Sequence, residues 1–345
     1  MARKQTILTP GKLMNEKGCL AQAGYATSLV REYDRKEIAA SWLRIKEWDY
    51  YLIHNSRFGV ALTIADNGYM GLDGISLLDF ETGFAHTNSP MRILPKGKTG
   101  MPATSVKGDV ARKGKGYEIV YRNDGKTRHL TAHMDDFKDG KPIDIDVKLT
   151  DVPRDSMVIA TPWAGKPKAF YYNQKINCLR ADGWCKYDGR TYEFTPDEAM
   201  AVLDWGRGVW TYRNTWYWGS GSGWVNGHRV GWNLGYGFGD TSAASENMLF
   251  VDGVAHKLDE VCFHIPQKDG KDDFMSPWTI DDNEGRVKLT FTPVMDRADN
   301  TDFGILGSNA HQVFGWFDGY FVADSGEKIE IRHFMAFAEK VANKW

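Results

Sequence analysis

The chain has 345 residues, which is enough for about two domains of ordinary size. Its 43 Lys and Arg residues nearly balance 45 Asp and Glu residues, and this net charge of −2 argues against a general nucleic-acid-binding protein, which needs a basic surface. A hydrophobic content of 42% is typical of a globular protein, and 13 Trp with 36 Gly favour a β-rich fold with aromatic walls.

The sequence carries no visible targeting signal. No apolar run of about 18 residues occurs, so no transmembrane helix is expected, and the first ten residues lack the apolar stretch of a signal peptide. The four cysteines, Cys19, Cys178, Cys185 and Cys262, form no CxxC pair. We therefore expect a cytoplasmic protein with free thiols. A peripheral membrane contact and the oligomeric state are left open.

The first strand of interest contains Asp49, Tyr50 and His54. These side chains either point into a ligand pocket or, in the case of Asp49, form an ion pair at its rim. All three are therefore candidate ligand-binding residues.

Strand and hairpin signals dominate the rest of the chain. Residues that alternate between apolar and polar predict half-buried strands, and Gly turns between them predict hairpins. The predicted strands, in chain order, cover residues 117–121, 128–134, 143–149, 184–187, 191–194, 287–291, 320–323 and 328–332, with turns at Asn123-Asp124-Gly125, Asp188-Gly189, Asp252-Gly253 and Ser325-Gly326. Two short helices are predicted over residues 195–203 and 336–342, the first from Pro196 in its opening turn.

The chain also contains a candidate internal repeat. Residues 183–194 and 319–331 both contain a Gly, an aromatic residue, a short strand, an Asp/Gly turn and a second strand. Either all hairpins look alike at this level, or the chain holds two related β-domains in tandem. We expect the second, with domains at residues 1–195 and 196–345, each built as a barrel or sandwich of short antiparallel strands.

One segment combines charge with aromatic residues. Asp204 and Arg207 lie in the run Asp-Trp-Gly-Arg-Gly, which is followed by several further Trp and Tyr residues. A carboxyl group beside apolar rings has a raised pKa and can donate a proton, so Asp204 is a candidate acid. The alternative is a structural ion pair between Asp204 and Arg207 that ties one domain to the other.

The same segment resembles the signature of a bacterial family, domain of unknown function 2804. The run from Asp204 to Trp218 carries the resemblance, and four further stretches agree with it. These are residues 46–51 (KEWDYY), 173–176 (NQKI), 246–249 (ENML) and 338–345 (AEKVANKW). The resemblance covers essentially the whole chain, but it implies no activity.

A more distant similarity is to the tandem-lipocalin proteins, which include carotenoid 1,2-hydratase, tocopherol cyclase and fungal Diels–Alder cyclases. They share a β-hairpin with Gly in its first strand, followed by an Asp-x-x-x-Gly stretch that opens the second barrel. Residues 183–194, Asp204 and Gly208 are similar in order. The resemblance implies an all-β fold of two tandem lipocalin-like (calycin) β-barrels packed together, and it aligns Asp204 with a functional acid. Trp205 departs from the pattern, since His or Arg often follows the Asp there.

Other constellations carry less chemistry. His129 and His133 lie four residues apart on a predicted strand, and about 13 Å between such side chains is too far for one metal ion. Glycine-rich residues 219–223 and 235–239 lead into no convincing helix, so a phosphate cradle is not expected. We predict no metal and no cofactor.

Together these observations predict a protein that binds a hydrophobic, isoprenoid- or lipid-like small molecule in an aromatic cavity. Acid-catalysed hydration, isomerisation or cyclisation of an alkene would suit such a cavity, because aromatic faces stabilise a carbocation. Asp204 would be the acid and Arg207 would orient it or hold a polar head group. The predicted wall consists of Trp205, Trp210, Tyr212, Trp216 and Trp218.

Two alternatives remain. A lipid carrier or chaperone would use the same cavity without an acid. A carbohydrate-active protein would use exposed Trp faces to stack on sugar rings, in an open groove with several carboxylates.

Overall fold

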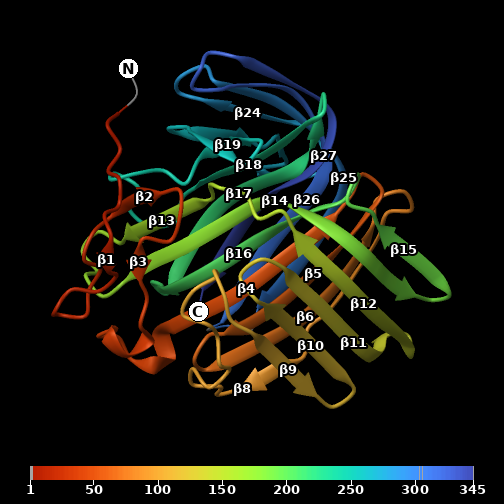
Figure 1. Cartoon of the computed structure of the whole chain (residues 1–345), viewed down its shortest axis with the longest axis horizontal. Helices are drawn as coiled ribbons and strands as arrows, with labels where there is room; N and C mark the ends of the chain where they lie inside the picture. Colours follow the sequence, from red (N-terminus) through yellow and green to blue (C-terminus); the bar gives the residue numbers. More distant parts are fainter. Residues whose placement is uncertain (1–2, 303, 305, 345) are drawn as a thin grey trace.

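The computed structural model describes residues 3–302, 304 and 306–344, and these residues form an all-β protein (Figure 1). The only helices in this part of the chain are two 3-10 turns, η1 (Arg35–Glu37) and η2 (Trp42–Arg44). The all-β prediction is confirmed. None of these described helices is long or apolar enough to cross a membrane.

The first large sheet has 14 strands and runs in the order β7-β6-β5-β4-β16-β14-β12-β11-β10-β9, with β2, β8, β13 and β15 attached to its sides. It curls until β7 meets β11, where His86 Nε2 lies 2.9 Å from the carbonyl oxygen of Phe137. Its strands are β2 (Gly24–Ala26), β4 (Ile45–His54), β5 (Phe58–Asp66), β6 (Met70–Asp79), β7 (Phe84–Asn88), β8 (Met91–Ile93), β9 (Val110–Gly114), β10 (Tyr117–Asn123), β11 (Arg128–Lys138), β12 (Lys141–Thr150), β13 (Met157–Pro162), β14 (Phe170–Tyr187), β15 (Arg190–Phe194) and β16 (Met200–Val209).

The second large sheet has nine strands in the order β20-β19-β18-β17-β27-β26-β25-β24-β21. It also curls and brings β21 close to β18, where the backbone N–H of Phe263 donates to the Tyr236 hydroxyl at 3.2 Å. Its strands are β17 (Arg213–Val225), β18 (His228–Tyr236), β19 (Met248–Val251), β20 (Val254–Lys257), β21 (Val261–His264), β24 (Trp278–Asp282), β25 (Val287–Asp302), β26 (Gly307–Val322) and β27 (Lys328–Lys344). Two small pairs complete the fold: β1 (Gly11–Lys12) with β3 (Arg31–Glu32), and β22 (Gln267–Lys268) with β23 (Lys271–Asp272).

The two curled sheets follow one another along the chain and form the tandem lipocalin-like architecture that was expected. Each encloses an apolar core of its own. Two further apolar clusters contain residues of both sheets. The sheets contact one another where β14 and β16 pack against β17 (Figure 1). Asn177 joins the sheets at this contact, since its Nδ2 donates to the carbonyl oxygens of Gly221 and Trp232.

The predicted hairpins are present, and the repeat has a structural counterpart. Gly183 on β14 pairs with Val147, and Gly319 on β26 pairs with Leu289 at the matching place in the second sheet. Both glycines have positive φ, 149° and 139°, and a Cβ at either position would overlap the carbonyl oxygen of the neighbouring strand. The recurring Gly therefore allows the same close approach of two strands in each sheet.

Both helix predictions are wrong. Residues 195–199 form a turn and residues 200–203 begin β16, while residues 336–342 lie inside β27. The cause is burial on both faces. Ala201 and Leu203 pack in the core of the first sheet, and Val202 packs between the sheets. A strand that is buried on both sides is apolar at every position, so its period of two is hidden and the segment can be mistaken for a helix.

All four cysteines are free thiols. Cys178 and Cys185 are buried, and burial raises the pKa of both, that of Cys178 to about 12. We expect a thiol reagent to react rapidly with only Cys19 and Cys262 in the native protein and with all four after unfolding without reductant. Rapid reaction of all four native thiols would contradict the packing around β14.

Candidate active site

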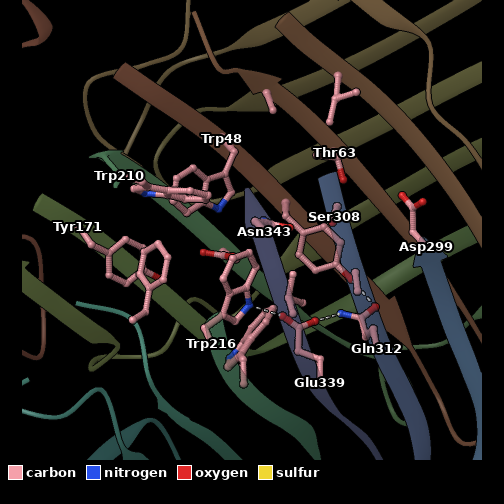
Figure 2. Close-up of a pocket in the computed structure, with 18 of the residues that line it drawn as sticks. Trp48, Thr63, Tyr171, Trp210, Trp216, Asp299, Ser308, Gln312, Glu339 and Asn343 are labelled. Carbon is pink, nitrogen blue, oxygen red and sulfur yellow. Dashed lines mark hydrogen bonds between the residues drawn. The ribbon is translucent and has the colours of Figure 1, made fainter. Parts of the chain in front are cut away.

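A cavity of about 320 Å³ lies between the two sheets rather than inside either one. Its walls come from β4, β5, β6, β14 and β16 of the first sheet and from β17, β25, β26 and β27 of the second (Figure 2). Seven aromatic side chains line it: Trp48, Tyr50, Tyr171, Trp210, Trp216, Trp218 and Phe238. A cavity with this lining is suited to an apolar ligand.

Two rows of side chains, one on each sheet, carry many of the polar groups of the cavity, and the acids Glu246 and Asp299 lie outside these rows. In the first sheet the row consists of residues paired directly across neighbouring strands: Thr63, Tyr50, Asp204 and Lys175. In the second sheet the corresponding row is Arg297, Gln312, Glu339 and Trp218. Residues opposite one another in a sheet point to the same face, so each row presents its side chains together to the cavity.

Trp210 connects the aromatic residues of the wall. Its ring centroid lies 5.2 Å from that of Trp48, 5.8 Å from that of Trp216 and 4.9 Å from that of Phe238, each in an edge-on arrangement. Trp48 also stacks on Tyr171, with centroids 6.0 Å apart. Such contacts add to the free energy gained by burial and hold the rings in fixed orientations.

Gly206 makes room for Trp48. The indole ring of Trp48 lies over its Cα, and a Cβ at position 206 would overlap the ring. We expect Gly206→Ala to displace Trp48, to weaken ligand binding and to cost about 1–3 kcal/mol of unfolding free energy. Thermal unfolding and near-UV circular dichroism would measure this. In a Trp48→Leu background the same change should lose most of its effect, and an undiminished effect there would contradict the explanation.

Lys175 and Asp204 form a buried ion pair in the first row. Lys175 Nζ lies 2.9 Å from Asp204 Oδ1 and also donates to Asn173 Oδ1 at 2.9 Å. Asn173 Nδ2 donates to Asp204 Oδ1 at 2.6 Å. The ammonium group lies 4.3 Å from the centroid of the Trp218 ring, which adds a cation–π contact from the second sheet. The pair therefore has the polar partners that a buried charge requires.

Two glutamates, Glu339 on β27 and Glu246 just before β19, line the same cavity, and neither forms an ion pair with another described residue. Glu339 accepts hydrogen bonds from Trp216 Nε1 at 2.8 Å and from Gln312 Nε2 at 2.9 Å (Figure 2). Burial is the main cause that raises its pKa to about 7, and the Asp204 carboxylate contributes to the rise. Burial also raises the pKa of Glu246, although Lys175 and a hydrogen bond from Asn233 oppose the shift. The cavity thus holds a carboxyl group that keeps its proton near neutral pH.

The structure brings together five of the predicted site residues. Asp204, Tyr50, Trp210, Trp216 and Trp218 all line the cavity. Tyr50 also reaches across to the second sheet, where its hydroxyl lies 3.4 Å from Gln312 Oε1.

The expected contact between Asp204 and Arg207 is not formed. The two residues are three positions apart on one strand, so their side chains leave it on opposite faces. Arg207 points toward the core that the curled first sheet encloses, where its Nη1 lies 3.0 Å from Asp49 Oδ1. Trp205 packs in the same core. The Asp204 carboxylate pairs with Lys175 instead.

Three further predicted residues lie outside the cavity lining. Asp49 is buried as the partner of Arg207. His54 is buried at the end of β4, where burial lowers its pKa to about 4 and its Nδ1 lies 3.2 Å from the carbonyl oxygen of Asn55. Tyr212 is exposed on the connection between the sheets.

Sequence reasoning missed several residues of the site, above all Trp48, Lys175, Glu246, Arg297 and Glu339. A signal for four of them was present. Each of the five stretches that carry the family resemblance contributes at least one side chain to this cavity, and together they include Trp48, Lys175, Glu246 and Glu339. No comparable signal marked Arg297.

Within the described ranges, no group of three or more His, Cys, Asp or Glu side chains is arranged to hold a metal ion. His129 and His133 each lie 2.7 Å from an aspartate oxygen, of Asp146 and Asp144 respectively, on the strand beside them. These two histidines therefore have separate partners.

Several solved structures are similar to this chain over most of its length. The crystal structure of a protein from Nitrosomonas europaea, described as AttH, is similar with a TM-score of 0.54 and 14% identity over 91% of this chain and 96% of that one. Kievitone hydratase from Nectria haematococca matches with a TM-score of 0.49 and 11% identity over 98% of each chain. CghA, crystallised with Sch210972, matches with a TM-score of 0.49 and 10% identity over 96% of this chain and 97% of that one.

Among curated proteins, none matches this sequence significantly. The profile of the family described as domain of unknown function (DUF2804) matches residues 4–345. Because that match spans nearly every residue, the chain belongs to the DUF2804 family.

Proposed function

We propose that this protein binds an apolar, isoprenoid- or lipid-like small molecule between its two sheets and catalyses a proton-initiated reaction of an alkene in it. The observation that carries the proposal is Glu339, a buried carboxyl group with a pKa of about 7 in a cavity walled by aromatic rings. A proton donor works best when its pKa lies near the working pH.

The chemistry that this arrangement supports starts at the carboxyl proton. The π electrons of the alkene form a new C–H bond with the Glu339 proton, which leaves a carbocation and a carboxylate. Loss of a neighbouring proton gives an isomer, and addition of water gives an alcohol after one proton is released. Attack by a second alkene closes a ring and moves the positive charge to that alkene, which then loses a neighbouring proton. In each case the released proton restores the Glu339 carboxyl group, so no external reagent besides water is needed.

The other groups have separate roles. The faces of Trp216 and Trp218 and the negative charge of Asp204 stabilise a developing cation. Lys175 holds Asp204 in place and balances its charge. Asp204, the acid predicted from sequence, is thus a charge-stabilising residue in this proposal, and Glu339 is the donor.

The binding half of the proposal is tested on purified protein. Native mass spectrometry followed by solvent extraction should detect a co-purified apolar molecule, released on denaturation. Thr63→Trp fills the cavity from the first row and should abolish this retention, whereas Thr131→Trp, on β11 and outside the cavity, should not. Equal retention by both variants would contradict binding between the sheets.

The catalytic half is tested in heavy water. Wild-type protein incubated with the extracted ligand in D2O should introduce deuterium at carbon, which mass spectrometry detects, because the new C–H bond carries the donor's proton. Glu339→Gln should bind the ligand without introducing deuterium. A ligand that is retained but never labelled by the wild type would identify a carrier instead.

The carbohydrate alternative has less support. Stacking on sugars needs accessible Trp faces, whereas Trp210 and Trp218 are buried and contact other rings. Three of the four acids that line the cavity, Asp204, Glu246 and Glu339, are buried, and only Asp299 is exposed.

A further inference from the structure

Arg297 is the one cation of the second polar row. On β25 it lies opposite Gln312 and lines the cavity. Its guanidinium donates from Nη1 to Gln312 Oε1 at 2.9 Å and to the Tyr50 hydroxyl at 3.4 Å, and from Nε to Thr87 Oγ1 at 3.3 Å. All three acceptors are neutral, and they come from both sheets.

The charge of Arg297 has no carboxylate partner in the part of the chain that the structure describes. The neighbouring acid Asp296 pairs with His311, at 2.7 Å, and none of the ion pairs formed among residues 3–302, 304 and 306–344 includes Arg297. A guanidinium presents five N–H donors in a rigid plane whose geometry matches a carboxylate. Here neutral groups of two sheets fix that plane, so it is held in position before any ligand arrives.

The position of Arg297 sets the shape of a matching ligand. Arg297 and Glu339 are two strands apart in one row, which corresponds to about 10 Å, and Trp218 is one strand further. An anionic group at Arg297 therefore lies several bonds away from any atom that meets the Glu339 proton. The body of a ligand held in this way would pass Gln312 and reach the aromatic wall.

On this basis, and resting on the proposed function, we infer that Arg297 binds the carboxylate of an amphipathic ligand. The ligand class is an apolar-chain carboxylic acid, and its alkene lies several carbons from the acid group, beside Glu339. Arg297 is thus a binding residue that sets which part of the chain reaches the donor.

The test uses two probes of equal chain length, dodecanoate and dodecanol, titrated into full-length protein and followed by intrinsic Trp fluorescence. Wild-type protein should bind dodecanoate about tenfold or more tightly than dodecanol, as expected for a charged hydrogen-bonded pair. Arg297→Gln should lower the affinity for dodecanoate to that for dodecanol and leave dodecanol unaffected. Arg57→Gln, a surface control that pairs with Glu198, should change neither affinity.

A second variant separates recognition from folding. Arg297→Lys keeps the charge but loses the planar fork, so its preference for dodecanoate should fall between those of the wild type and Arg297→Gln. Equal binding of both probes by the wild type would overturn the assignment of Arg297 and leave the proposed function standing. Binding of neither probe would overturn both.

Discussion

Replacing Lys175 with Met should cost about 3–5 kcal/mol of unfolding free energy, the range found when one member of a buried ion pair is removed. Lys175 is buried, and its Nζ is the cation nearest to the Asp204 carboxylate. Without it, Asp204 shares the cavity with Glu246 and Glu339 and has no cation within ion-pair distance among the described residues. Urea denaturation at neutral pH would measure the loss.

The double variant gives this prediction its control. Asp204→Asn removes the stranded carboxylate, so Lys175→Met with Asp204→Asn should recover part of the loss, because the two residues contact one another. Lys186→Met, on the exposed side of β14, should shift the free energy by no more than about 0.5 kcal/mol. A Lys175→Met protein within about 1 kcal/mol of the wild type would show that the pair is not buried as described.

The second large effect concerns pH. The pKa of Glu339 is about 7 in the folded chain against 4.5 ordinarily, so the folded state binds the proton more tightly than the unfolded state. Its contribution to stability is fully present below about pH 4.5 and is lost as the pH rises to about 7. At about 1.4 kcal/mol for each pKa unit, the loss is on the order of 3 kcal/mol.

Glu339→Gln should lack this dependence, since an amide does not titrate. The free energy of unfolding of the variant relative to the wild type should therefore rise by on the order of 2–3 kcal/mol between about pH 5 and about pH 8. Glu246, whose pKa is raised in the same direction, affects both proteins alike and cancels in the comparison. A difference that stays constant with pH would mean that Glu339 ionises normally.

The segment from Asp204 to Trp218 shows which features of the site could be predicted from neighbouring residues in the sequence and which could not. Alternation in other strands of the chain predicted the β fold, and the density of Trp and Tyr in this segment predicted three aromatic residues of the wall, Trp210, Trp216 and Trp218. Successive side chains of β16 point to opposite faces of the sheet, so Asp204 and Arg207 lie on different faces. Which of these faces lines the cavity depends on what packs against each side of the strand. A strand buried on two faces offers no polar side to decide this.

The rest of the site depends on pairings between distant segments. Glu339 and Lys175 reach the cavity from strands in different sheets, and the register that aligns each with its row is set by neighbouring strands rather than by nearby residues. No motif in the sequence marks Arg297. Only the folded chain shows that its charge has no acidic partner among the described residues.

The location of the ligand tests the account most directly. A crystal structure of the protein with a bromine-terminated long-chain fatty acid would reveal the bromine by its anomalous signal. We predict a carboxylate on Arg297 and a bromine among the aromatic rings beside Trp210, between the two sheets. A bromine peak inside the first sheet beside Trp205, or inside the core of the second sheet, would contradict it.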